Sequence, residues 1–135
     1  MADARELARR FQDAINAGDE VALLDLQHED FVDHTPNPSH GATRADFVTQ
    51  KMRGLRASFS DLRLRVEQMV VEGDMLAVLW TMAGTNDGPF AGEDATGSFI
   101  RFSGMNLERI EDGRIAEHWS IYDSQSLFHQ LGRLG

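Results

Sequence analysis

Hydrophobic and polar residues alternate in the second half of the chain, where four segments have the pattern of β-strands. In residues 62–67 every second position is apolar, between arginines and a glutamate, which predicts a strand with one buried face. Residues 75–84 are almost entirely apolar, which predicts a strand covered on both faces. Two longer runs, 98–110 and 114–123, flank the sequence Glu-Asp-Gly, which is a hairpin signal. Together the four segments predict an antiparallel meander.

The first half of the chain has the periodicity of helices instead. Apolar residues recur at helical spacing in residues 3–17, in residues 20–27 and in a third segment, residues 43–59. A short strand over residues 31–34 separates the second helix from the third. A closing helix begins at Ser124, after the last predicted strand.

This order of elements predicts a single domain over residues 1–135, of the α+β class. We expect three N-terminal helices to lie against one side of a curved antiparallel sheet. Such an arrangement leaves an apolar cavity between the sheet and the helices, which is a usual place for a small-molecule site.

The turn of the last hairpin decides which side chains face each other across its two strands. A two-residue turn, Asp-Gly, would place Asn106 opposite Trp119. A three-residue turn, Glu-Asp-Gly, would place Asn106 opposite His118, with Ser120 one diagonal step away. Because a slip of one residue exchanges the two faces of a strand, the two turns predict different pockets, and the residue pattern leaves both open.

Composition excludes several classes of partner. The chain has 22 acidic and 13 basic residues, a formal charge of −9, which argues against nucleic acid and anionic membrane surfaces. It has no cysteine, and no apolar run approaches the length of a membrane span. The N-terminal sequence lacks the apolar core of a secretory leader, so we expect a cytoplasmic protein.

Six short motifs follow one another along the chain: RRFQDAINAGD, HEDFVDH, RASFSD, RFSG, ERIEDGRIAEHW and LFHQLG. In their order and spacing they resemble the SnoaL-like polyketide (ester) cyclases of the nuclear-transport-factor-two-like superfamily, from about Leu7 to Gly132. The resemblance implies a cone-shaped α+β fold that encloses a cavity. It also favours the three-residue, bulged turn, because in the family the residues at the positions of Asn106 and Ser120 point into one cavity.

The resemblance also implies a chemistry, and this sequence departs from it. The best-known members close a polyketide ring by intramolecular aldol condensation without metal or cofactor. They use an aspartate to remove a carbon-bound proton and a histidine near the carbonyl oxygen, and these positions are Ser120 and Asn106 here. A serine hydroxyl is no base near neutral pH unless another group activates it. Either another residue is the base, the reaction differs, or the protein only binds.

Three residues are therefore candidates for the acid–base role. We expect His118 to carry the proton, because imidazole titrates near neutral pH, although it could instead hydrogen-bond the backbone and hold the sheet. Asp123 could orient a ring or a water, or else cap the closing helix. Asp33 is the third candidate. At most one of Asp33 and His34 faces the cavity, because neighbouring strand residues point to opposite faces.

The expected substrate contacts combine polar and apolar side chains, several of which could simply be core. Asn106 and Ser120 could hydrogen-bond a ligand, and Arg101 could pair with a carboxylate or form an outward salt bridge. The full expected set is Asn106, Ser120, Tyr122, Trp119, Trp80, Met82, Phe102, Ile15, Met52, His34 and Arg101. We expect no metal site, because His28, His34 and His40 lie six residues apart in a loop region.

These residues lead to one main functional hypothesis and two rivals. The first is a cofactor-free acid–base enzyme, of cyclase, isomerase or hydration type, that acts on a hydrophobic oxygenated molecule such as a polyketide. The second is a binding module without catalysis. The third is a relative of hydroxylases or epoxide hydrolases, in which Asp33, Arg101, Asp123, Tyr122 and Asn106 would have to converge. The resemblance further implies a homodimer formed through the outer face of the sheet.

Overall fold

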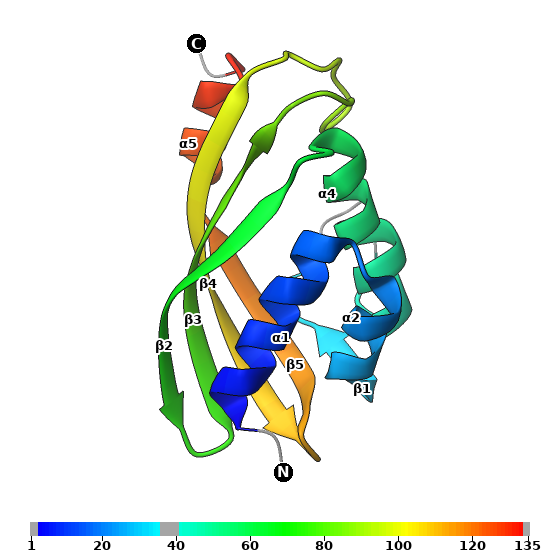
Figure 1. The fold of residues 1–135 in the computed structure, drawn as a ribbon, viewed down its shortest axis with the longest axis vertical. Coiled ribbons are helices and arrows are strands. Elements are labelled where there is room, and N and C mark those ends of the chain that lie inside the picture. The colour runs from blue at the N-terminus through cyan, green and yellow to red at the C-terminus, as the bar shows by residue number, and fades with distance from the viewer. Residues whose placement is uncertain (1–2, 36–40, 134–135) are drawn as a thin grey trace.

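A computed structural model describes residues 3–35 and 41–133 of the chain, and it has the expected α+β architecture (Figure 1). Five strands form one curved sheet in the order β1-β5-β4-β3-β2. Strands β2 to β5 are the predicted antiparallel meander, and β1 (Gln27–Asp33) joins its edge in parallel to β5. The helices α1, α2 and the third helical segment all cover one face of this sheet (Figure 1). In the described ranges no helix has the length and apolarity that crossing a bilayer requires.

The helices begin and end where the sequence provides caps. Helix α1 (Ala4–Ala17) is capped by Asp3 and ends at Gly18, whose φ of 65° is a left-handed conformation that glycine adopts without strain. Helix α2 (Glu20–Leu26) is capped by Asp19, whose carboxylate accepts from the Ala22 amide.

The third predicted helix is divided into three parts. A capping box between Thr43 and Asp46 opens α3 (Arg44–Asp46), a π-helical segment η1 (Phe47–Met52) follows, and α4 (Arg53–Ser58) completes it. The number of helices therefore differs slightly from the expected three. A π-helical turn inserts residues into the regular helical register, and such turns occur frequently at functional sites.

Strands β2 (Arg63–Glu72) and β3 (Met75–Thr85) pair as predicted, with a bulge after Val66. The expectation that β3 is covered on both faces is wrong for this chain. Its inward residues are buried, but Leu79 on the outer face is 38% exposed. The apolar character of β3 therefore has two sources, a core face and an open apolar outer face.

The last hairpin, β4 (Phe99–Glu111) and β5 (Arg114–Tyr122), follows neither of the two predicted registers throughout. Glu111 pairs with Arg114, so the turn has two residues, and both of them have positive φ. The pairing then shifts by one residue at Ala116, which is a β-bulge in β5. Ile115 and Ala116 are both buried, which a regular alternation of faces would not allow. Beyond the bulge Asn106 lies opposite Ser120.

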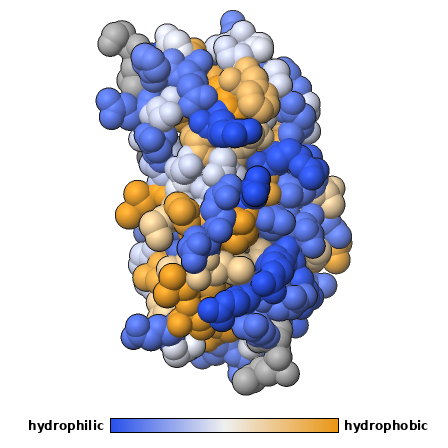
Figure 2. Space-filling model, turned by 60° about the vertical axis from the view of Figure 1, so that its left-hand side comes forward, coloured by the Kyte–Doolittle hydropathy of each residue, from blue (hydrophilic) through white to orange (hydrophobic). Residues whose placement is uncertain are grey.

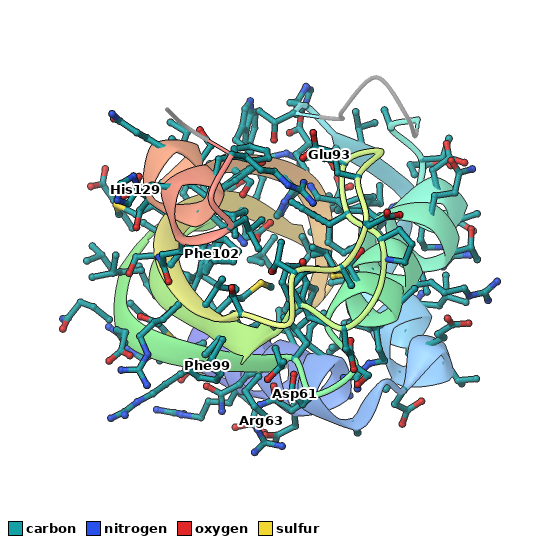
Figure 3. The ribbon with its side chains drawn as sticks, turned by 90° about the horizontal axis from the view of Figure 1, so that it is seen from above. Asp61, Arg63, Glu93, Phe99, Phe102 and His129 are labelled. Atoms are coloured by element: carbon teal, nitrogen blue, oxygen red, sulfur yellow. The ribbon has the colours of Figure 1, made fainter. Side chains whose placement is uncertain are left out.

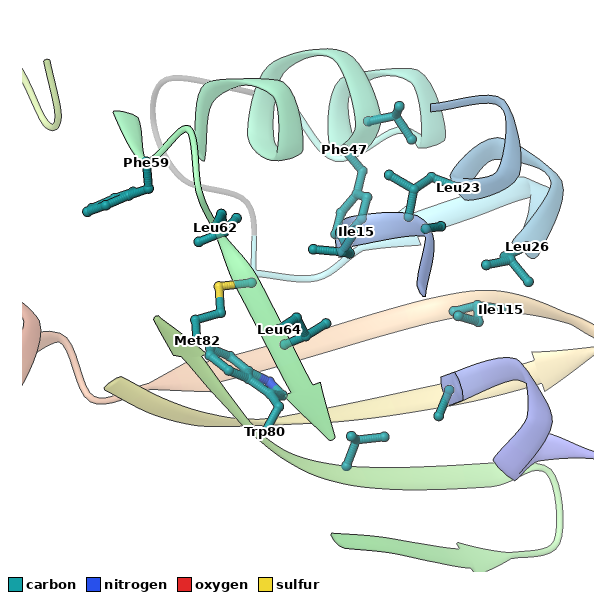
Figure 4. Close-up of a cluster of buried hydrophobic side chains, with 14 of the residues drawn as sticks. Ile15, Leu23, Leu26, Phe47, Phe59, Leu62, Leu64, Trp80, Met82 and Ile115 are labelled. Carbon is teal, nitrogen blue, oxygen red and sulfur yellow. The ribbon is translucent and has the colours of Figure 1, made fainter. Parts of the chain in front are cut away.

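The core lies between the concave face of the sheet and the helices (Figure 4). Trp80 and Met82 reach it from β3, and Phe47 reaches it from η1 on the opposite side (Figure 4). Helix α5 (Ser124–Gln130) begins where predicted and closes one end of the curved sheet, as the view along the long axis shows (Figure 3). The sheet curls around the space into which Phe102 points (Figure 3).

Candidate active site

A cavity of about 410 Å³ lies between the concave face of the sheet and the third helical segment. Most of its wall is apolar, and a smaller number of polar side chains converge on it, which is the usual composition of a small-molecule site. The apolar wall includes Phe11, Phe47, Trp80, Met82, Phe102 and Phe128. The polar lining includes Thr35, Gln50, Lys51, Ser58, Asn106, His118 and Ser120.

His118 lines the cavity and is bonded to a carboxylate behind it. Its Nδ1 lies 2.9 Å from each carboxylate oxygen of Glu108, and the two residues are 3% and 4% exposed. A carboxylate can only accept a hydrogen bond, so beside it Nδ1 is the donor, and in the neutral imidazole Nε2 then holds the lone pair. Nε2 forms no hydrogen bond to any described residue. The imidazole is therefore oriented by Glu108, with its basic nitrogen free for a ligand.

The bulge in β5 is what creates this pair. It brings Glu108 opposite His118, two positions along from the pair Asn106 and Ser120, so all four residues share the concave face. The ring of Phe47 packs edge-on against the imidazole at 5.2 Å, between centroids. These contacts restrict rotation of the His118 side chain.

Asn106 and Ser120 both line the cavity, as the sequence led us to expect. The indole Nε1 of Trp80 donates to Oδ1 of Asn106 at 2.9 Å, which leaves the amide nitrogen of Asn106 as a donor. Gly104 makes room for this arrangement, because a Cβ there would collide with the Trp80 ring and lie 2.7 Å from the carbonyl oxygen of Ile121. The amide of Ser120 donates to Thr35 Oγ1 at 2.9 Å.

Asp33 is buried behind the cavity wall and does not line it. Its Oδ2 accepts from Lys51 Nζ at 3.0 Å, and its Oδ1 accepts from the amide of Thr35 at 2.9 Å. Burial on its own would raise the pKa of Asp33, but the Lys51 ammonium and the Thr35 N–H outweigh it, so the pKa lies below the usual range. Asp33 is therefore ionised at neutral pH and already occupied, which suits a positioning role better than that of a base.

Tyr122, Met82, Phe102 and Met52 line the cavity together with Trp80. Ile15 does not line it but borders a separate hollow of about 260 Å³, which Met52 also borders.

Four other expected site residues lie elsewhere. Trp119 stands between two inward residues of β5 and so points to the convex face, where its ring stacks on His34 at 4.5 Å. Arg101 is exposed on the convex face for the same reason. Asp123 caps α5 by accepting from the amide of Ser126 at 2.9 Å.

These positions bear on the other sequence hypotheses. The five residues of the hydroxylase-like set do not converge, because Arg101 and Asp123 are outside the cavity and Asp33 is behind its wall. Of the three histidines considered for a metal, His28 lies near carboxylates of the last hairpin and His34 near Glu117. His40 lies outside the described residues.

Sequence reasoning missed Glu108 and Lys51. The sequence shows that Glu108 lies two residues from Asn106 and therefore on the same face of the strand. Its pairing with His118 could not be predicted, because that pairing requires the bulge in β5. Lys51 gave no signal, because a lysine in a predicted helix is normally solvated, and the π-helical turn that presents it has no clear sequence mark.

The comparisons with known proteins agree with this architecture. The family model for SnoaL-like polyketide cyclase matches residues 5–131. TsrD from Streptomyces laurentii is 30% identical, with a TM-score of 0.89 over 99% of this chain and 100% of that chain. IdmH from Streptomyces antibioticus, described as a candidate polyketide cyclase, is 29% identical, with a TM-score of 0.85 over 97% and 99%.

AclR from Streptomyces galilaeus, described as a candidate hydroxylase, is 27% identical, with a TM-score of 0.85 over 97% of this chain and 96% of that chain. Among curated proteins none matches. Because the family model covers nearly the whole chain, this protein is a member of the SnoaL-like polyketide cyclase family.

Proposed function

We propose that this protein is an acid–base enzyme that acts on a hydrophobic, oxygenated small molecule such as a polyketide. The observation that carries the proposal is the pair formed by Glu108 and His118, in which Nδ1 is bonded to the carboxylate and the residue belongs to the wall of a largely apolar cavity. IdmH, the relative described as a candidate polyketide cyclase, supports the substrate class.

His118 would replace the aspartate that the cyclases of this family use. Nε2 accepts a proton from a carbon next to a carbonyl group, and the electrons of the C–H bond move onto the carbonyl oxygen. Glu108 then faces the imidazolium that forms and stabilises it, as a carboxylate does behind a catalytic histidine. Return of the proton to another atom gives isomerisation, and its transfer to a hydroxyl group that leaves gives dehydration.

Asn106 and Ser120 would position the substrate rather than move its proton. Both can hydrogen-bond a ligand oxygen from the concave face, directly opposite each other. In this proposal the base stands two residues before the position of the family's aspartate, on the same strand.

The test is exchange of carbon-bound hydrogen for deuterium in an aryl 1,3-diketone, followed by NMR. We expect the protein to accelerate the exchange, and His118→Gln to lose about 100-fold or more of the acceleration. Glu108→Gln should lose less, because the imidazole remains. Trp119→Phe, a change on the convex face, is the matched control and should retain the wild-type rate. If the protein bound the diketone without accelerating the exchange, the enzyme proposal would be refuted and the protein would be a binding module without catalysis.

We also propose that the chain forms a homodimer through the convex face of the sheet. Figure 2 shows hydrophobic side chains gathered over the lower part of this face. Five residues of β2 to β5 contribute, and each is between 38% and 77% exposed: Val70, Leu79, Met105, Leu107 and Ile121. Leu79, Met105 and Ile121 are cross-strand neighbours in one row, so the patch is continuous.

A further inference from the structure

Lys51 is a cation in the wall of a largely apolar cavity, and the proposed proton transfer to His118 does not use it. It belongs to η1, its side chain is 19% exposed, and its ammonium lies over the ring of Phe47 at 5.1 Å. Asp33, held by Thr35, fixes the ammonium from behind. The lysine is therefore anchored at one side and open to the cavity at the other.

The Lys51 ammonium has more N–H donors than its contact with Asp33 uses. It carries three N–H groups, and in the described ranges Asp33 is the oxygen acceptor that it contacts. Asp33 is only 1% exposed and also accepts from Thr35, so its carboxylate does not face a ligand. The N–H groups of the ammonium that Asp33 does not use favour an occupant that brings an oxygen.

Lys51 and His118 lie around the same aromatic ring. The Phe47 ring is 5.1 Å from the Lys51 ammonium and 5.2 Å, between centroids, from the imidazole of His118. The backbone links them too, because Asp33, the partner of Lys51, is the register neighbour of His118 across β1 and β5. Both groups line the same cavity, so a single ligand beside Phe47 can contact both of them.

We propose that Lys51 binds the ligand oxygen that becomes negatively charged, and that the ligand is an enolisable ketone or a phenol. This deepens the proposed function and rests on it for the reaction step. When Nε2 of His118 takes the proton from carbon, the C–H electron pair moves to the carbonyl oxygen, and the enolate oxygen accepts from Lys51. The proton remains in the cavity on His118, so the total charge of the site does not change.

The role of Asp33 follows from this arrangement. It is a positioning residue, because it contacts Lys51 and not the ligand. Its carboxylate holds the ammonium at the cavity wall, and the largely apolar surroundings strengthen the attraction between Lys51 and an anionic oxygen.

The experiment measures binding rather than turnover. The probes are 4-nitrophenol, whose phenolate has its own visible absorbance band, and the neutral analogue 4-nitroanisole. We expect the wild-type protein to bind the phenolate more tightly than the anisole, and to lower the apparent pKa of bound nitrophenol. Lys51→Met should lose about 10- to 100-fold of this preference, while anisole binding stays unchanged.

Three further variants make the result decisive. Lys51→Arg keeps a cation and should retain part of the preference. The double variant Lys51→Met with Asp33→Asn removes both charges together, so it tests the same point if the single change leaves Asp33 unpaired and unfolds the protein. His118→Gln should lose the acceleration of deuterium exchange but keep the preference for phenolate, which separates this proposal from the proposed function. Equal binding of phenolate and anisole by the wild type, or an unchanged preference in folded Lys51→Met, would overturn it.

Discussion

At the scale of single residues, two carboxylates outside the cavity lining hold two of the side chains that line it. Glu108 orients His118, and Asp33 orients Lys51, each from a nearly inaccessible position. The sequence predicted His118 correctly as a cavity residue but could not identify its carboxylate. Charged residues are rarely buried without a partner, so their pairing depends on contacts between distant segments. A sequence pattern does not contain those contacts.

Asp33 gives a prediction about stability and pH. Its pKa is depressed in the folded state, so it contributes stability above the pKa of the unfolded chain, near 4, and loses it as pH falls through the folded value. We expect Asp33→Asn to reduce the free energy of unfolding by about 3 kcal/mol at pH 7, because Lys51 loses its partner. The difference from wild type should shrink below about pH 4.

Urea unfolding at a series of pH values measures this difference. Asp13→Asn, a change of an exposed carboxylate on α1, is the matched control and should alter stability by less than about 0.5 kcal/mol. A loss in Asp33→Asn that is equal at pH 7 and pH 3 would show that the carboxylate acts through packing and not through its charge.

At the scale of elements, most of the fold could be predicted because each local pattern agrees with the final structure. The alternation in β2, the caps of α1 and α2 and the Asp-Gly turn all specify their elements from short stretches of chain. The bulge at Ala116 could not be predicted in this way, because two apolar residues in succession also fit a regular strand. The pairing of Glu108 with His118 therefore could not be predicted from the sequence.

Gly104 in β4 provides a test of how this strand shapes the cavity. An alanine there would collide with Trp80 and approach the backbone of β5, so Trp80 must move and its bond to Asn106 must lengthen or break. We expect Gly104→Ala to destabilise the protein by about 1–3 kcal/mol and to change the tryptophan fluorescence of the folded state. Chemical unfolding followed by fluorescence measures both effects.

The control for this change is another glycine with open space. Gly54 in α4 has no atom within 4 Å of an added Cβ, so Gly54→Ala should be neutral or stabilise the helix by up to about 1 kcal/mol. If Gly104→Ala proved as stable as Gly54→Ala, with unchanged fluorescence, then Trp80 would have room that the structure does not show.

At the scale of the whole molecule, the sheet has two apolar faces, and only one is covered within the chain. The concave face packs on the helices and borders the cavity, whereas the convex face carries the patch of Val70, Leu79, Met105, Leu107 and Ile121. This explains why β3 has the pattern of a strand buried on both sides. The sequence identified the apolar residues of β3 correctly. It could not decide whether the convex face of this strand is covered by a helix of the same chain or by another chain.

The homodimer proposal is tested at Ile121, which is 77% exposed in the isolated chain. We expect the wild type to sediment as a dimer, because an apolar patch of this kind gains free energy when it is removed from water. Ile121→Lys places a charge within the patch and should weaken association by about 30-fold or more, as loss of a central interface residue does. Analytical ultracentrifugation over a range of concentrations measures the dissociation constant.

The matched control is Val21→Lys, because Val21 is similarly exposed at 70% but lies on α2, on the helical side of the molecule. It adds the same charge without touching the convex face and should leave the dissociation constant unchanged. A wild type that is monomeric at the highest concentrations, or an Ile121→Lys variant that associates as tightly as Val21→Lys, would refute the dimer. The cavity lies on the concave side of the sheet, so monomeric Ile121→Lys should still bind 4-nitrophenolate, which makes assembly and ligand binding separable in one variant.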